Sequence, residues 1–130
     1  MRAGMTRGIA GIAGGLAVWM LVATLGNLAL RFAWPGYADV EKEMMFTLGM
    51  LIARLLLGAV SSLCAGLTAA WIAKRDGRVV AILAAVLFAL FIPVHYGLWS
   101  RFPAWYHIVF LASLIVMTLV GAAMFRRSAS

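Results

Sequence analysis

Four long apolar segments divide the chain, and they restrict its fold more than any other feature of the sequence. They cover residues 9–30, 46–73, 79–98 and 107–125. An apolar run of about 18 residues or more is long enough to cross the hydrocarbon core of a bilayer as an α-helix. The chain is 65% hydrophobic and only 12% charged, whereas soluble domains carry roughly 25% charged residues. We therefore expect an all-α membrane protein in which residues 1–130 form a single domain of four transmembrane helices.

The basic residues indicate how these helices are oriented. With the amino terminus in the cytoplasm, the inner side carries seven of them, namely Arg2, Arg7, Lys74, Arg75, Arg78, Arg126 and Arg127. The outer side carries three, namely Arg31, Lys42 and Arg101. The positive-inside rule then predicts an up-down antiparallel bundle in the cell inner membrane, with amino and carboxyl termini cytoplasmic. The basic residues do not form a surface on which basic and aromatic side chains alternate, so nucleic acid is not an expected partner.

Small residues mark the faces on which these helices are expected to pack. Gly11 and Gly15, in the first segment, have the four-residue spacing that lets two membrane helices approach closely. The second segment repeats this spacing at Gly58, Ser62, Gly66 and Ala70. Residues four apart return to nearly the same face of an α-helix, so these four are expected to form one packing seam. The simpler explanation, that glycine is common in membrane helices, stays open for the first segment.

One arginine, Arg54, lies inside the second apolar segment, where a charge is costly. It follows Phe46 by eight residues, or roughly 12 Å along a helix, which places it in the outer half of the membrane. Helical side chains lean toward the amino terminus of their helix, so Arg54 is able to reach a phosphate headgroup at the interface, or Glu43. The other interpretation is a functional contact with an anion or substrate in a wet cavity. The sequence leaves both interpretations open.

The polar segment 31–43 holds three of the four acidic residues and precedes the second apolar segment. The sequence WPG at 34–36 predicts a turn. Asp39 is the expected N-cap of a helix that begins near Val40 and continues to Ala73. Such a helix is longer than the roughly 30 Å core of a bilayer, so its first turns are expected to protrude or to bend into the interface.

The polar residues of the spans gather in the outer half and define a candidate ligand-binding set. This set comprises Arg54, His95, His107, Asn27 and Glu43. His95 and His107 flank the short connection between the third and fourth helices, so their rings are expected to lie near each other. Two such histidines are able to ligate a haem or a metal ion, but the sequence contains no HxxxH, ExxH or CxxC pattern. We expect no cofactor, with a haem or metal at these two histidines as the alternative.

These features predict a small transport or ligand-binding protein with an outer-half pocket for an anionic solute or a lipid headgroup. The lipid bilayer is its expected surrounding. A homo-oligomer or a larger membrane complex is also expected, because four short helices enclose little space. The alternative function is that of a non-catalytic accessory or scaffold subunit. It would dock through its small-residue faces and through the aromatic residues at the outer boundary of the spans, among them Trp34, Trp99 and Trp105. No Ser, His and Asp arrangement or pair of in-membrane carboxylates is present, so an enzyme is not expected.

Overall fold

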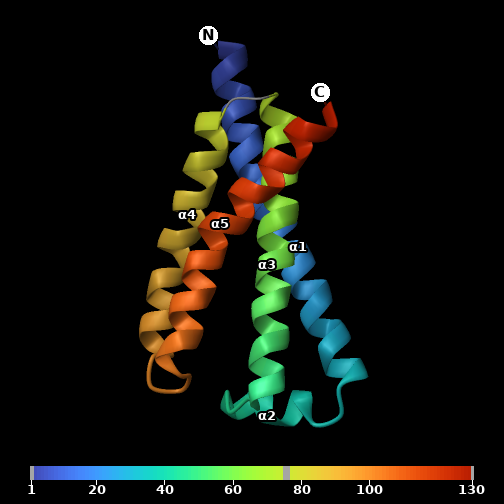
Figure 1. Cartoon of the computed structure of the whole chain (residues 1–130), viewed down its shortest axis with the longest axis vertical. Coiled ribbons are helices and arrows are strands. Elements are labelled where there is room, and N and C mark those ends of the chain that lie inside the picture. The colour runs from blue at the N-terminus through green and yellow to red at the C-terminus, as the bar shows by residue number, and fades with distance from the viewer. Residues whose placement is uncertain (1, 75–76, 130) are drawn as a thin grey trace.

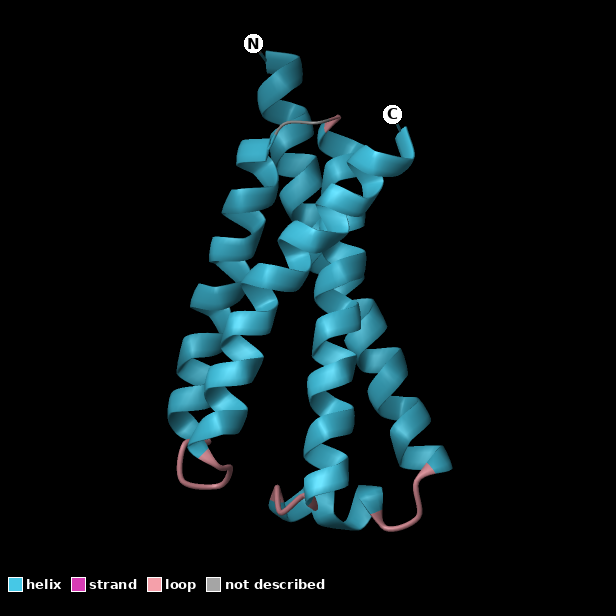
Figure 2. Cartoon of the chain, in the orientation of Figure 1, coloured by secondary structure: helices cyan, strands magenta, loops and turns pink. Residues whose placement is uncertain are grey.

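The computed structural model describes residues 2–74 and 77–129 (Figure 1). Its helices are α1 (Arg2–Ala33), α2 (Tyr37–Glu43), α3 (Leu48–Ala73), α4 (Gly77–Gly97) and α5 (Ala104–Ala129). No strand occurs within the described ranges (Figure 2). Every helix except the short α2 is long and apolar enough to cross a membrane, which confirms the all-helical class and the four apolar helices. The first of them is longer than the expected range 9–30 at both ends.

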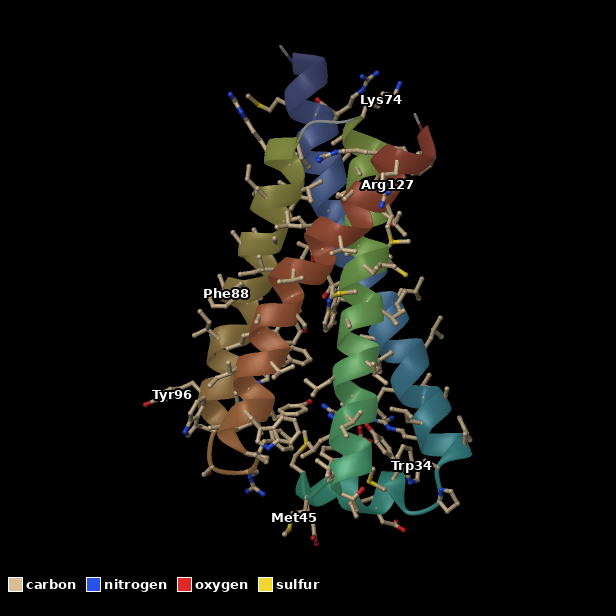
Figure 3. The ribbon with its side chains drawn as sticks, viewed as in Figure 1. Trp34, Met45, Lys74, Phe88, Tyr96 and Arg127 are labelled. Atoms are coloured by element: carbon tan, nitrogen blue, oxygen red, sulfur yellow. The ribbon has the colours of Figure 1, made fainter. Side chains whose placement is uncertain are left out.

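The four long helices run alternately up and down, and both ends of the chain lie at the same end of the bundle (Figure 1). We call this the terminal end. The opposite end carries α2 and the connection between α4 and α5, and we call it the α2 end (Figure 1). Lys74 and Arg127 mark the terminal end in Figure 3, and Trp34 and Met45 mark the α2 end.

The second apolar segment is not continuous with the helix before it, because two residues in the left-handed conformation interrupt the chain. Gly36, with a φ of 85°, precedes the first residue of α2, and Met44, with a φ of 54°, ends that helix. The predicted N-cap at Asp39 is therefore wrong, since Asp39 lies in the first turn of α2. Thr47 then caps α3 by accepting a hydrogen bond from the backbone nitrogen of Met50 at 3.3 Å. As a result, α2 lies across the end of the bundle (Figure 1).

Helix α1 packs against α3 through its glycines. A Cβ added at Gly11 would lie 3.3 Å from the carbonyl oxygen of Ala69. One added at Gly15 would lie 3.2 Å from the carbonyl oxygen of Ala65. The two helices therefore meet at backbone distance, which is how small residues stabilise helix pairs in a membrane, where apolar burial contributes little.

Helix α5 crosses α3 at a second close contact, at about the level of Ala65, which Gly15 of α1 faces. A Cβ added at Gly66 would overlap the backbone of Thr118. A Cβ added at Gly121 would overlap the carbonyl oxygen of Leu63. Only glycine fits at these two positions without separating the helices.

The remaining small residues of α3 contact two different neighbours. Gly58 faces α5, since a Cβ added there would lie 2.8 Å from the ring of Phe110. Ser62 instead accepts a hydrogen bond from the indole nitrogen of Trp19 on α1 at 3.0 Å and donates to the carbonyl oxygen of Gly58 at 2.9 Å. Ala70 is buried. The seam expected as one packing face is thus divided between α1 and α5.

Most of the apolar surface of the spans points away from the bundle. Between 17% and 33% of the most apolar part of each span is buried by the other helices. Large apolar side chains are exposed on all four spans, for example Leu21, Leu56, Leu90 and Val116. An apolar surface of this extent is typical of a protein that is surrounded by lipid.

Candidate functional site

Arg54 turns into the bundle at the second turn of α3, where neutral groups from α1, α2, α5 and the connection between α2 and α3 surround it. Its Nη1 donates to the hydroxyl of Tyr37 at 2.8 Å and lies 3.5 Å from Oδ1 of Asn27. Its Nε lies 3.4 Å from the hydroxyl of Tyr106. The guanidinium carbon stands 4.5 Å from the centre of the Phe46 ring, a cation–π contact. Within residues 2–74 and 77–129, no carboxylate forms an ion pair with Arg54.

Asn27 connects Arg54 to an ion pair at the α2 end. Its Oδ1 accepts a hydrogen bond from the Tyr37 hydroxyl at 2.7 Å, and its Nδ2 donates to Oε2 of Glu41 at 2.8 Å. The other oxygen of Glu41 accepts from Nε of Arg31 at 2.6 Å. Asn27 and Arg31 are four residues apart on α1, so they share a face and reach the same carboxylate. We call these residues, with Arg54 and Tyr106, the polar network.

Two titratable residues of α2, Tyr37 and Glu41, belong to the polar network. Their pKa values keep the polar network in one charge state at neutral pH. Burial raises the pKa of Tyr37 above its ordinary value, although the charge of Arg54 opposes this shift. The phenol therefore keeps the proton that it donates to Asn27. Burial also acts to raise the pKa of Glu41, but the hydrogen bonds from Arg31 and Asn27 outweigh it, and the pKa of Glu41 is lowered. Glu41 is therefore an anion that neutralises Arg31.

A pocket of about 370 Å³ lies beside the polar network, and all five helices contribute to its lining. Its polar lining residues are Thr24, Asn27, Arg31, Glu41, Arg54 and Tyr106. Its aromatic lining residues, besides Tyr106, are Trp19, Phe91 and Phe110. The volume falls within the range of sites for small organic ligands, roughly 300–1,000 Å³. Two arginines and one glutamate line the pocket, so its lining carries net positive charge.

Glu43, a member of the expected binding set, lies outside this pocket. Its side chain is exposed, and its backbone carbonyl accepts a hydrogen bond from Nη1 of Arg101 at 3.0 Å. Residues two apart on an α-helix lie about 200° apart, so α2 turns only one of Glu41 and Glu43 toward the bundle. The placement of Glu43 is thereby corrected, and the acid at the pocket is Glu41.

His95 and His107 lie near each other, and they bond to each other rather than line the pocket. Their Nδ1 atoms are 2.6 Å apart, and Nε2 of His107 lies 3.3 Å from the carbonyl oxygen of Trp99. Both side chains are buried. The ring of Phe110, which lines the pocket, lies 4.7 Å from the His95 ring. The histidine pair therefore ties α4 to α5 directly behind the pocket wall.

No group of three or more His, Cys, Asp or Glu side chains that could hold a metal ion occurs in the described part of the chain. At the histidine pair, the facing nitrogens share one hydrogen bond, and neither ring has a carboxylate beside it in the contacts above. The groups at the α2 end that are able to contact a ligand are hydrogen-bond donors, and they belong to Arg54, Asn27 and Tyr106. Such donors bind oxyanions.

Three residues of the site are not singled out as such by the sequence analysis: Trp19, Tyr37 and Tyr106. The two tyrosines resemble ordinary members of an aromatic belt at the membrane boundary, and nothing in their spacing distinguishes them. Trp19 carries a detectable signal, because it lies in the middle of an apolar segment, whereas tryptophan is enriched at the interfaces. Glu41 is distinguished by the sequence only as one of the three acidic residues of the segment 31–43.

The fold and the site together define the class of the protein. Four apolar helices of spanning length and a charged pocket at one end indicate a multi-pass α-helical membrane protein. The sequence matches no family model, and no curated protein or solved structure is detectably similar to it. The function is therefore inferred from the site itself.

Proposed function

We propose that this protein is a small transport or ligand-binding protein whose pocket at the α2 end holds an anionic solute or an anionic lipid headgroup. The observation that carries the proposal is the position of Arg54, which lines a pocket of about 370 Å³ while its own contacts are neutral. Ionisable residues within membrane spans usually face a cavity and mark a ligand path. A guanidinium binds phosphate and carboxylate groups with charge-assisted hydrogen bonds.

The remaining charges at the pocket support the choice of an anion. Both oxygens of Glu41 accept hydrogen bonds, one from Arg31 and one from Asn27. This carboxylate is therefore committed to Arg31 and does not neutralise Arg54 directly. One positive charge is left over at the pocket, and an anionic ligand would compensate it.

For the orientation, we propose that the α2 end faces the outer side of the cell inner membrane. The terminal end carries the larger set of basic residues, among them Lys74 and Arg127 (Figure 3). Arg75, which belongs to the same set, lies outside the described residues. The positive-inside rule favours the cytoplasm for such an end, so the pocket opens toward the outer leaflet.

Anion binding is tested by the thermal stability of the purified protein in detergent, because a ligand that binds the folded state raises the unfolding temperature. The probes are inorganic phosphate, acetate and glycerol phosphate. We expect at least one of them to raise the unfolding temperature of the wild type in a concentration-dependent and saturable way. The Arg54→Gln variant is expected to lose this response, and Arg54→Lys to keep part of it, because lysine retains the charge without the planar fork of arginine.

Arg101→Gln is the matched control, since Arg101 lies at the same end of the bundle but is exposed and bonds the backbone of Glu43. This variant is expected to respond like the wild type. A response that is equally strong in Arg54→Gln would overturn the proposal, as would the absence of a response to all three probes. In the latter case, co-purification with a larger membrane complex would favour the role of an accessory subunit.

A further inference from the structure

We infer that the occupant of the pocket is an anionic amphiphile, that is, a lipid-like molecule with a phosphate or carboxylate headgroup. Its headgroup lies against Arg54, its hydrocarbon part extends toward Trp19, and it enters sideways from the lipid between α1 and α4. This inference rests on the proposed function and names the ligand class of the same site.

The pocket changes from polar to apolar along the helix axis. On α1, the lining begins with Arg31 at the α2 end, continues through Asn27, and ends with Ala23 and Trp19. Arg31 and Trp19 are twelve residues apart, or about 18 Å along the helix. Trp19 lies near the middle of the 30-residue span of α1, so this end of the pocket reaches toward the middle of the bilayer.

The end of the pocket at Trp19, which we call the deep end, has few groups that could form hydrogen bonds with a hydrophilic anion. Trp19 directs its indole nitrogen away to Ser62, so that its ring, with those of Phe91 and Phe110, forms the wall. The Trp19 and Phe91 rings are 4.7 Å apart, and those of Phe91 and Phe110 are 5.3 Å apart. A polar group placed against such rings loses its hydrogen bonds with water and gains none, whereas a hydrocarbon chain is well accommodated.

The pocket is open on the side of α1. Its exposed lining residues, Thr24, Leu28 and Arg31, all lie on α1, whereas the two from α5, Tyr106 and Phe110, are buried.

The wall between α1 and α4 closes only toward the terminal end. There, Gly11 faces Val79 and Gly15 faces Leu83. The rings of Trp19 and Phe91 are in contact. Helices α1 and α4 diverge toward the α2 end (Figure 1). A lipid in the adjacent leaflet therefore reaches the pocket without leaving the membrane.

The test compares three probes in equilibrium binding to the purified full chain in detergent micelles. They are dioctanoyl phosphatidic acid, which has the anionic head and the chains, glycerol phosphate, which has the head alone, and dioctanoyl phosphatidylcholine, which has a zwitterionic head. We expect phosphatidic acid to bind at least about ten-fold more tightly than either of the others, because only it satisfies both ends of the pocket. The Arg54→Gln variant is expected to lose most of the preference for phosphatidic acid over phosphatidylcholine, because that preference depends on the anionic headgroup.

Two alanine-to-phenylalanine variants distinguish binding at the deep end of the pocket from binding at the headgroup end. Ala23 lines the pocket, and Ala23→Phe is expected to weaken phosphatidic acid by about ten-fold while glycerol phosphate is unaffected. Ala17 lies on the same helix but is exposed, so Ala17→Phe is expected to change neither. If phosphatidic acid and glycerol phosphate bind equally in the wild type, the inference is overturned and the proposed function stands. If no anionic probe binds, the proposed function fails and the inference fails with it.

A second measurement uses the wild-type protein alone, so its result does not depend on whether a variant folds. Phosphatidic acid with a photoreactive group in its acyl chain is crosslinked to the wild-type protein, and the labelled residues are mapped by mass spectrometry. Labels at Trp19, Phe91 or Phe110 support the inference. Labels confined to outward-facing residues such as Leu21, Leu25 or Ile82, which are exposed, overturn it.

Discussion

Arg54 is tolerated inside a membrane span because groups of the protein take the place of water around its guanidinium. The hydroxyl of Tyr37 accepts a hydrogen bond, and the ring of Phe46 faces the charge. Arg54 also leans toward the α2 end, as helical side chains lean toward the start of their own helix. This residue is thus not directed at a lipid headgroup outside the bundle. It is held by α2, a helix that covers the end of the same bundle.

Tyr37 is the residue on which this arrangement depends most directly, because its hydroxyl accepts from Arg54 and donates to Asn27. The Tyr37→Phe variant removes both hydrogen bonds at a fully buried position. We expect it to lower the free energy of unfolding by about 1–3 kcal/mol, as measured by reversible unfolding in mixed micelles. Tyr96→Phe is the matched control, since Tyr96 is 85% exposed, and it should leave the stability unchanged. Equal effects of the two variants would contradict the assignment.

The lowered pKa of Glu41 predicts a pH dependence of known sign. A carboxyl group whose pKa is lower in the folded than in the unfolded state stabilises the fold above its ordinary pKa, here 4.5, and loses this contribution as the pH falls further. We therefore expect the stability difference between the wild type and Glu41→Gln to be constant from neutral pH down to about 4.5 and to shrink at lower pH. Unfolding in mixed micelles at a series of pH values measures it.

Glu43→Gln is the control for this experiment, because the Glu43 side chain is exposed two residues away. Its stability difference from the wild type should be small at every pH. A difference for Glu41→Gln that already disappears near pH 6 would mean that the ion pair with Arg31 does not stabilise the fold in the way described.

At the scale of the elements, α3 is the central helix, and its small residues contact both α1 and α5. Around the middle of the helix, Ser62 bonds to Trp19 of α1. One turn further along, Gly66 lies against the backbone of Thr118 of α5. The same four-residue spacing therefore does not produce a single interface, because the neighbours cross α3 at an angle and each contacts only part of the seam.

The crossing of α3 and α5 predicts that Gly66→Ala is strongly destabilising. The added Cβ would overlap the Thr118 backbone, which has no rotamer by which to withdraw. We expect a loss of about 1–3 kcal/mol or more in the free energy of unfolding. Gly4→Ala is the control, since nothing lies within 4 Å of its added Cβ, and alanine is the better helix former by about 1 kcal/mol. The same sign for both variants would argue against the close crossing.

At the scale of the whole molecule, the bundle consists of two helix pairs that are close at the terminal end and apart at the α2 end (Figure 1). Helices α1 and α3 form one pair, and α4 and α5 form the other. The glycines of α1 and the crossing at Gly66 hold the pairs together toward the terminal end. At the other end, α2 and the polar network occupy the space between them. The pocket follows from this divergence.

The proposed orientation predicts which loops react with a membrane-impermeant maleimide in intact cells. In a Cys64→Ser background, which removes the single native cysteine, Ser100→Cys at the α2 end is expected to react directly. Lys74→Cys at the terminal end is expected to react only after the membrane is permeabilised, because the positive-inside rule places that end in the cytoplasm. Both positions are exposed, so access of the reagent is limited by the membrane alone. The reverse pattern of labelling would invert the orientation.

Sequence patterns were informative where the physics is local. The number of apolar helices follows from hydropathy, because the cost of burying charge in lipid acts residue by residue along the chain. The sequence predicts one helix whose first turns protrude or bend into the interface, and it does not predict the break at Met44. It also predicts the N-cap at Asp39, whereas the N-cap of α2 is Gly36. A left-handed residue such as Met44 leaves no reliable mark on composition.

The sequence by itself therefore determined the helical class, the apolar spans and the presence of one costly charge, Arg54. The tertiary structure alone decided what that charge meets. Tyr37 and Tyr106 are 17 and 52 residues away along the chain, and they reach Arg54 only because α2 folds back over the bundle and α5 crosses α3. Whether Glu41 or Glu43 faces the pocket depends on the rotation of α2 about its own axis. In the observed rotation, Glu41 accepts hydrogen bonds from Asn27 and Arg31 of α1, and no local pattern in the sequence encodes these contacts.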